Sequence, residues 1–261
     1  MPIQFFNKVL TKIRKRIVPG LRYLAASKIR LCRCCNKKTL VVSFSKGEER
    51  KLCIRCRANL RYEMIADYLR LCDLNGKTIV EFDSRSPLHC FLNEFSGYIR
   101  TYYSETEEKG KVKKDRGGIL RCEDITSMTF DNDSIDIMIS SDVLEHVPNI
   151  YDAFKEMARV LSVGGKSIFT VPNHSGVTKQ RAFIENNKII HIESPQYHSD
   201  PLTDRGILAF WDFGLDMEKF APDNLKVYVA NGPVGLDNRI LWVAEKISSG
   251  GRGDANLTST H

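Results

Sequence analysis

The sequence predicts an α/β protein in which a small cysteine-rich module precedes a parallel sheet. Three observations lead to this prediction. The first is a strand, helix and strand pattern: an apolar run over 135–140, an amphipathic stretch over 151–161 and a second apolar run over 167–171. The second is a set of two Cys-x-x-Cys pairs before residue 60. The third is charge, because residues 1–61 hold 17 Lys/Arg against two acidic residues, whereas the remaining 200 residues hold 22 against 30.

The N-terminal segment, residues 1–30, is basic and has a helical pattern. Apolar side chains recur at three- and four-residue steps over residues 3–18, and the basic side chains fall largely on other sides. Pro19-Gly20 interrupts this helix, and a second short helical segment is expected over 21–29. Two interpretations stay open: the first helix contacts an anionic membrane surface, or its apolar face packs on the body or on a second subunit.

The cysteine pairs predict a zinc-ribbon-like module over residues 31–59. Four thiolates suit a tetrahedral zinc ion with sulfur at about 2.3 Å, and four cysteines leave no open position for catalysis. The intervening strand is expected over 39–44, with its return beginning at 51–52. Cys34 is a spare, and unliganded thiols are the alternative. The expected ligands of a structural zinc ion are Cys32, Cys35, Cys53 and Cys56.

The body of the chain, residues 60–247, alternates helices with buried strands. A helix over 60–74 ends near Asn75-Gly76. The charged stretch 109–114 is expected to be a solvated loop, and the small, polar residues 248–261 are expected to be disordered. Strands are expected, in order, over 77–82, 98–103, 119–124, 135–140 and 167–171, followed by an antiparallel hairpin of 225–230 with 240–244.

Three segments of the body resemble the second half of class I S-adenosylmethionine (SAM) dependent methyltransferases of the type 11 group. They are "DVLEHV" from Asp142, "ARVLSVGGKSIFTVP" from Ala158, and "CEDITSMTF", which contains Asp124. The resemblance covers roughly residues 77–171, and weakly extends to 246. It implies a Rossmann-like sheet of seven strands, methyl transfer as the activity, and SAM as the cofactor.

The resemblance also implies where SAM is held. Glu81 matches the acid before the family's glycine-rich turn, but residues 83–87 read Asp-Ser-Arg-Ser-Pro and contain no glycine. Either hydroxyls and a guanidinium bind the SAM carboxylate here, or the site has decayed. Glu105 is the nearest acid for the ribose, and Asp124 matches the acceptor of the adenine amino hydrogen, with a turn cap as the alternative. The implied cofactor-binding residues are Glu81, Asp83, Ser84, Arg85, Glu105, Asp124, Ile125, Ser141 and Asp142.

The segment after the fifth strand, residues 173–214, is too long for an ordinary connection and is rich in polar groups. We expect it to cover the methyl acceptor. His198 is the expected base, Asp200 its orienting partner and His191 the alternate base, because a hydroxyl acceptor needs a positioned proton acceptor. The alternative is that His198 and Asp200 only hold a loop in place. A metal site formed by histidines and acidic residues is a further alternative, but the sequence has no ligand spacing that favours it.

The absence of a long apolar run and the cysteine spacing predict a cytoplasmic protein, with peripheral membrane contact through residues 3–18 as an option. We expect O-methylation of a glycan precursor or other small metabolite. One alternative is an RNA methyltransferase whose basic head contacts phosphates. The other is a catalytically inactive binding module, which the missing glycines favour. Fold alone does not discriminate among the three.

Overall fold

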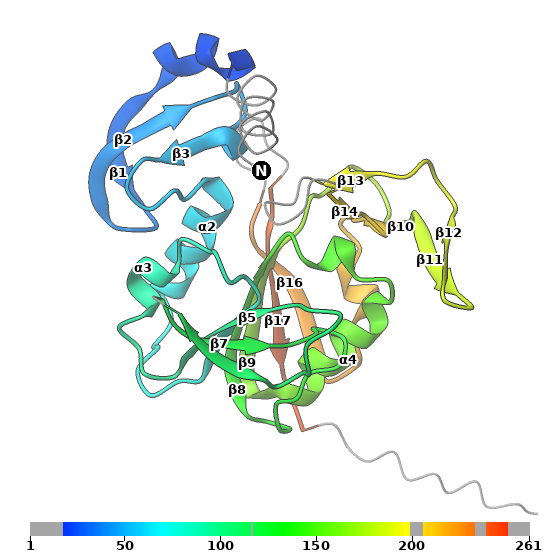
Figure 1. The fold of residues 1–261 in the computed structure, drawn as a ribbon. Helices are drawn as coiled ribbons and strands as arrows, with labels where there is room; N and C mark the ends of the chain where they lie inside the picture. Colours follow the sequence, from blue (N-terminus) through cyan, green and yellow to red (C-terminus); the bar gives the residue numbers. More distant parts are fainter. Residues whose placement is uncertain (1–17, 116, 199–205, 233–238, 250–261) are drawn as a thin grey trace, which may run out of the picture.

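A computed structural model describes residues 18–115, 117–198, 206–232 and 239–249. Figure 1 shows the N-terminal module in blue and, mainly in yellow, the insertion that follows the fifth parallel strand (residues 173–214), on either side of a large sheet. The basic helix expected over 3–18 and nearly all of the expected disordered tail fall outside the described ranges, so both stay predictions. None of the helices in the described part is long and apolar enough to span a membrane.

The large sheet has eight strands in the order β16-β17-β9-β8-β4-β5-β7-β6. Neighbouring strands from β9 to β7 are parallel, and β17 and β6 run antiparallel to their neighbours. This confirms the predicted parallel sheet with a closing hairpin. The strands are β4 (Ile79–Glu81), β5 (Tyr98–Tyr102), β6 (Val112–Asp115), β7 (Gly118–Cys122), β8 (Ile135–Ser141), β9 (Leu161–Thr170), β16 (Leu225–Asn231) and β17 (Leu241–Lys246).

The chain order places a topological switch between β4 and β8. From β4 the chain adds β5 and β7 on one side, and then crosses to β8 and β9 on the other. Open α/β sheets bind ligands at the carboxyl ends of the strands beside such a switch. The carboxyl edge at Glu81 and Ser141 is therefore the expected location of the site.

Helices cover both faces of the sheet. α4 (Ile150–Val160) and the 3₁₀ helix η5 (Met217–Phe220) cover one face, where fully buried Phe154 lies edge-on to Phe169 and also contacts Phe220. α2 (Leu60–Leu69) and α3 (His89–Leu92) cover the other face. The core on this second face continues into the cysteine cluster of the N-terminal module. α4 buries one apolar stripe with the 3.6-residue period of an amphipathic helix.

The N-terminal module is a three-stranded antiparallel sheet in the order β1-β2-β3. Arg33, just after the first strand, pairs with Glu63 and Asp67 of α2, and Arg70 donates a hydrogen bond to the Cys34 carbonyl at 2.6 Å. Ion pairs as well as the shared hydrophobic core therefore hold the module against α2. Its elements are the 3₁₀ helix η2 (Val18–Ala26), β1 (Lys28–Cys32), β2 (Lys37–Ser43), the 3₁₀ helix η3 (Glu48–Arg50) and β3 (Lys51–Cys53).

The structure differs from two local predictions. Residues 109–114 are not simply a solvated loop, because β6 pairs with β7; an exposed strand of charged residues carries no apolar alternation that would reveal it. The short helical segment, expected over 21–29, ends at Ala26, and β1 begins at Lys28.

The insertion consists of short strands: β10 (Lys179–Gln180), β11 (Ala182–Glu185), β12 (Lys188–His191), β13 (Tyr197–His198), β14 (Ile207–Leu208) and β15 (Trp211–Asp212).

Candidate active site

Glu81 ends β4 and is 1 % exposed. The Tyr98 hydroxyl donates a hydrogen bond to its carboxylate, and Thr101 donates one to its carbonyl at 3.1 Å. Burial, and next the negative charge of Asp83, raise the pKa of Glu81 to about 8. A neutral carboxyl group therefore sits at the base of the expected SAM site at neutral pH.

The glycine-free turn after β4 is held by side chains. Asp83 accepts a hydrogen bond from the Tyr62 hydroxyl at 2.6 Å and one from the Arg85 amide at 2.8 Å. The guanidinium of Arg100, a residue that is 4 % exposed, donates to the Ser84 carbonyl at 3.0 Å. No residue of this turn has a positive φ, so its backbone does not require glycine. Arg85 is exposed and free to reach a carboxylate in solvent.

The ribose and adenine residues lie after β5 and β7. Glu105 is exposed beyond the end of β5. Asp124 follows β7, and its Oδ1 accepts hydrogen bonds from the Thr126 amide at 2.9 Å and the Thr126 hydroxyl at 2.7 Å. This is the turn-cap geometry of the alternative prediction. The other carboxylate oxygen, Oδ2, takes no part in the cap and lies 3.8 Å from Lys109 Nζ. Ile125 is buried beside it. The assignments to ribose and adenine stay predictions.

Asp142, directly after β8, lies between two guanidinium groups. It pairs with Arg61 from the start of α2 and with Arg239 from the approach to β17, the latter at 2.7 Å. Arg61 and Arg239 also pair with Glu49 of η3, at 3.3 and 3.4 Å. Asp142 has a φ of 53°, and the Ser141 hydroxyl beside it is 3.1 Å from that of Thr170. Sequence reasoning missed both arginines, because they are distant in sequence from Asp142.

A second polar cluster consists of Glu145 and His146, in the 3₁₀ helix η4 (Leu144–His146) after β8, and His198 of the insertion. Glu145 is 1 % exposed. Its Oε1 is 3.5 Å from His198 Nδ1 and 3.8 Å from His146 Nε2, and the two imidazole rings meet edge to face at 5.0 Å. The pKa of His198 is raised above its usual value, because the interaction with the Glu145 carboxylate outweighs the opposing effect of burial. Glu145 thus lies where it can orient His198. Asp200, for which the sequence predicts this role, lies outside the described residues, and its assignment stays a prediction.

Hydrogen bonds fix the insertion onto this cluster. The Phe210 amide donates to the Glu145 carbonyl at 2.7 Å, and the Trp211 indole donates to the Val147 carbonyl at 2.8 Å. His146 Nδ1 lies 2.8 Å from the Leu208 carbonyl. These contacts place His198, on β13, over the carboxyl end of β8. His191 is exposed at the end of β12, and its role as alternate base stays a prediction.

The four predicted zinc ligands come together. Their sulfur atoms all lie within 4.8 Å of one another, with Cys32 and Cys56 at 3.6 Å and Cys35 and Cys53 at 4.0 Å. Tetrahedral zinc–sulfur bonds of about 2.3 Å require sulfur atoms about 3.8 Å apart, so the donors fit the ion. Burial raises the pKa of the Cys32 and Cys35 thiols, an effect that a bound cation would oppose. Cys34, the spare, instead lies 3.6 Å from the Pro87 carbonyl.

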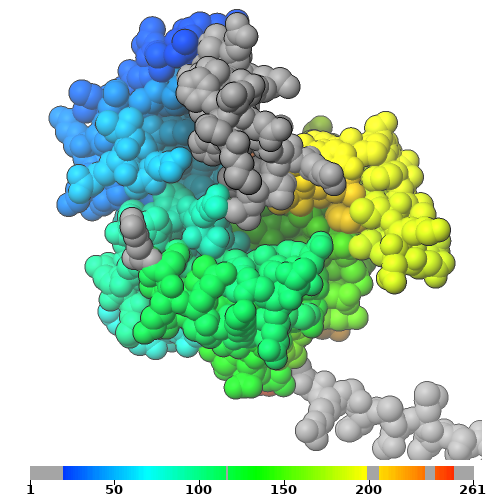
Figure 2. Space-filling view, in the orientation of Figure 1, coloured from blue at the N-terminus to red at the C-terminus, as the bar shows by residue number. Residues whose placement is uncertain are grey.

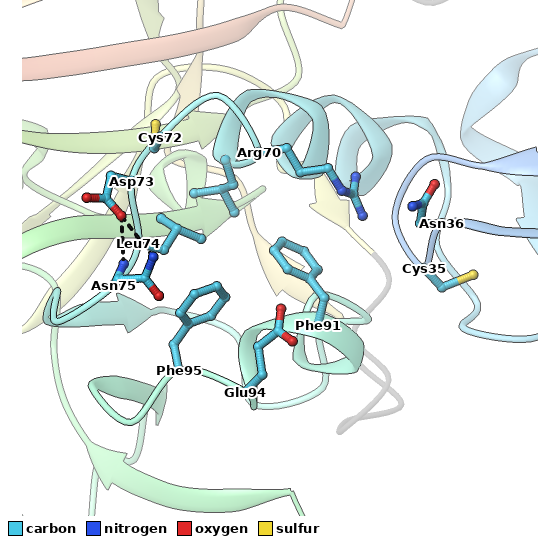
Figure 3. A pocket seen from close by; sticks show the side chains of 11 residues that line it. Cys35, Asn36, Arg70, Cys72, Asp73, Leu74, Asn75, Phe91, Glu94 and Phe95 are labelled. Carbon is cyan, nitrogen blue, oxygen red and sulfur yellow. Dashed lines mark hydrogen bonds between the residues drawn. The ribbon is translucent and has the colours of Figure 1, made fainter.

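A cavity of about 330 Å³ lies elsewhere, between the end of α2, α3 and the Cys35 loop. Figure 3 shows Phe91 and Phe95 beside it, with Arg70 reaching from α2. Asp73 and Asn75, which also line it, precede β4, so the cavity is at the amino side of that strand. We therefore do not assign it to the cofactor.

Residues 86–169 match the family model described as a methyltransferase domain. No curated protein matches the chain. Among solved structures, a SAM-dependent methyltransferase from Mesorhizobium loti is similar at 14 % identity and a TM-score of 0.45, covering 70 % of this chain and 97 % of that one. One from Methanosarcina mazei is similar at 16 % identity and a TM-score of 0.41, covering 69 % and 97 %. Another, from Clostridium acetobutylicum, is similar at 11 % identity and 0.42, covering 70 % and 89 %.

The match covers 84 of the 261 residues, and together with the strand order it supports a class I methyltransferase domain in the body of the chain. The match also supports methyl transfer as the activity of this domain, with SAM as the expected methyl donor. Residues 86–169 hold β5 to β8, nearly all of β9, and Glu145 and His146 of the cluster. Glu81, the first residues of the turn and His198 lie outside the matched range.

Proposed function

We propose that the protein transfers the methyl group of SAM to a hydroxyl oxygen of a glycan precursor or other small polar metabolite. The observation that carries this proposal is the cluster of Glu145, His146 and His198 beneath the insertion. An alcohol is a poor nucleophile until its proton is removed, so a buried carboxylate with two imidazoles suits an oxygen acceptor. Methyl transfer from a sulfonium otherwise needs little beyond in-line placement.

The position of the insertion supports a small acceptor. In the space-filling view the N-terminal module (blue) and the insertion (yellow) lie on different sides of the body (Figure 2). β13 and β14 lie against the carboxyl end of β8 through the His146 and Glu145 contacts. An acceptor that reaches the cluster is therefore enclosed by chain from the insertion. RNA binding by the basic head and membrane contact through residues 3–18 remain predictions, because they depend mostly on residues outside the described ranges.

The test is to incubate the purified protein with methyl-labelled SAM and cell extract and to separate glycan, small-molecule and RNA fractions. We expect label in a glycan or small-molecule fraction, and at least ~10²-fold slower labelling with Glu145→Gln. Glu185→Gln makes the same chemical change at an exposed position of β11 and serves as the matched control. Label confined to RNA would refute the acceptor class. Absence of SAM binding by calorimetry would favour the inactive binding module.

We also propose that Cys32, Cys35, Cys53 and Cys56 hold one structural zinc ion. The fit of the sulfur distances to a tetrahedron supports this assignment. Four thiolates complete the coordination of zinc, so the ion would fold the module and would not contact the acceptor.

A further inference from the structure

The Glu145 carboxylate lacks the partners that a buried charge needs. Glu145 is 1 % exposed, and within the described part of the chain neither Oε1 nor Oε2 receives a hydrogen bond. An unpaired carboxylate taken out of water costs several kcal/mol even after relaxation. Native proteins rarely retain such a group unless a ligand or ion completes it. A positive group, either a protonated imidazole or a metal ion, is therefore needed to balance this carboxylate.

The nearest arginines are already engaged. Arg61 and Arg239 lie at this edge of the sheet, but both guanidinium groups pair with Asp142 and with Glu49. The two guanidinium charges are therefore balanced by two carboxylates within their own network. What faces Glu145 directly is a pair of imidazole rings, from His146 and His198.

The hydrogen bond of His146 determines which of its nitrogens carries a proton. Its Nδ1 is 2.8 Å from the Leu208 carbonyl oxygen, which can only accept, so Nδ1 must be the donor. In the neutral ring Nε2 then holds a lone pair, and this is the nitrogen that faces Glu145 Oε1. A lone pair directed at a carboxylate oxygen is unfavourable, so either Nε2 is also protonated or a cation lies between Nε2 and the carboxylate. Metal-binding histidines use the same arrangement, with one nitrogen on a backbone carbonyl and the other on the metal.

The positions of the three donor atoms fit one ion. Glu145, His146 and His198 each offer one ligand atom, and these atoms all lie within 4.8 Å of one another. Bonds of about 2.1 Å at angles of 90–109° would hold such atoms about 3.0–3.4 Å apart. The 3.5 and 3.8 Å from Glu145 Oε1 to the two imidazole nitrogens require only a small contraction, and these two nitrogens lie within 4.8 Å of each other. Two imidazoles and one carboxylate are the donors that first-row divalent metals accept, and they leave further positions open.

We propose that Glu145, His146 and His198 bind one divalent transition-metal ion at the carboxyl end of β8. This inference deepens the proposed function and assigns His198 as a ligand in place of the predicted base. An acceptor hydroxyl that takes an open position on the cation loses its proton to solvent more readily. The oxygen then forms a bond to the methyl carbon while the carbon–sulfur bond of SAM breaks. The electron pair stays on sulfur, and the products are a methyl ether and S-adenosylhomocysteine.

Manganese(II) alone is a suitable probe, because thiolates select zinc whereas Mn²⁺ accepts nitrogen and oxygen donors. Mn²⁺ is titrated into zinc-loaded protein without SAM, and free Mn²⁺ is followed by electron paramagnetic resonance. We expect about one Mn²⁺ bound per chain, and at least ~10-fold weaker binding for Glu145→Gln and for His198→Gln. Glu185→Gln, which alters an exposed carboxylate on β11, should bind Mn²⁺ like the wild type.

Thermal unfolding separates ion binding from a folding defect. Mn²⁺ should raise the melting temperature of the wild type and of Glu185→Gln, but not that of Glu145→Gln. Without Mn²⁺, Glu145→Gln should be at least as stable as the wild type, because it removes an unpaired buried charge. Equal Mn²⁺ affinity in Glu145→Gln and the wild type, or no binding by the wild type at millimolar Mn²⁺, would overturn the proposal. Since no acceptor is used, this result does not depend on the proposed methyl acceptor.

Discussion

Replacement of Glu81 by Gln should change how the stability of the protein depends on pH. The Glu81 carboxyl group is buried, and its pKa is raised from 4.5 to about 8. Between these values the folded protein holds a proton that the unfolded chain has lost, so folding becomes less favourable as the pH rises. A pKa near 8 instead of 4.5 corresponds to at most about 5 kcal/mol across this interval. Gln has a similar shape and does not ionise, so it removes this contribution.

The assay is urea unfolding of wild type and Glu81→Gln at pH 5, 6.5 and 8 with zinc present. We expect the free energy of unfolding of the variant, relative to the wild type, to increase by several kcal/mol between pH 5 and pH 8. Glu94→Gln changes an exposed carboxyl group after α3 and should follow the wild type at each pH. If the curves for Glu81→Gln and wild type stay parallel from pH 5 to pH 8, the neutral buried carboxyl group is the wrong description of this site.

Three further predictions concern the zinc ion, the core and the cofactor. Metal analysis should find about one zinc per chain, and a chelator should lower the melting temperature; less than a tenth of an equivalent after chelator-free purification would contradict the ribbon. Phe154→Ala should cost about 3–5 kcal/mol of unfolding free energy in a denaturant titration, whereas Tyr151→Ala, at a position 48 % exposed on the same helix, should cost far less. Calorimetry should show SAM binding weakened by about 1–3 kcal/mol in Asp124→Ala. Thr126→Ala, which removes one turn bond but keeps the carboxylate, should bind SAM normally, and equal losses would make Asp124 only a cap.

β8 and β9 were predictable because each contains a nearly continuous apolar run of strand length. Residues 135–140 lie within β8, the run 167–171 ends one residue beyond β9, and the predicted hairpin is β16 with β17. The cysteine spacing similarly predicted four sulfur atoms that the structure brings together. Such features are local, so the period and spacing of a short segment contain the information. β6 was missed because an exposed edge strand of charged residues has no apolar period.

The interactions of the site were harder to predict because they join distant segments. The sequence predicts a role for His198 from its residue type, but its partner Glu145 lies more than fifty residues earlier in the chain. Asp142 was assigned to the site, whereas nothing near it in sequence indicates Arg61 or Arg239. Pairings of this kind depend on how the sheet, α2 and the insertion pack. A single sequence shows the residue types but not which of them meet.

The contacts of the N-terminal module connect its proposed zinc ion to the residues at the carboxyl edge of the large sheet. The cysteines hold β3 beside the turn after Cys32, and η3 directly precedes β3. Glu49 of η3 pairs with Arg61 and Arg239, the two residues that hold Asp142 at the carboxyl end of β8. Cys34 of the same module contacts Pro87 of the glycine-free turn. We expect loss of the metal to displace Glu49, which would leave each arginine with Asp142 as its remaining carboxylate partner. The expected contribution of the module to methyl transfer is therefore to fix this edge of the sheet.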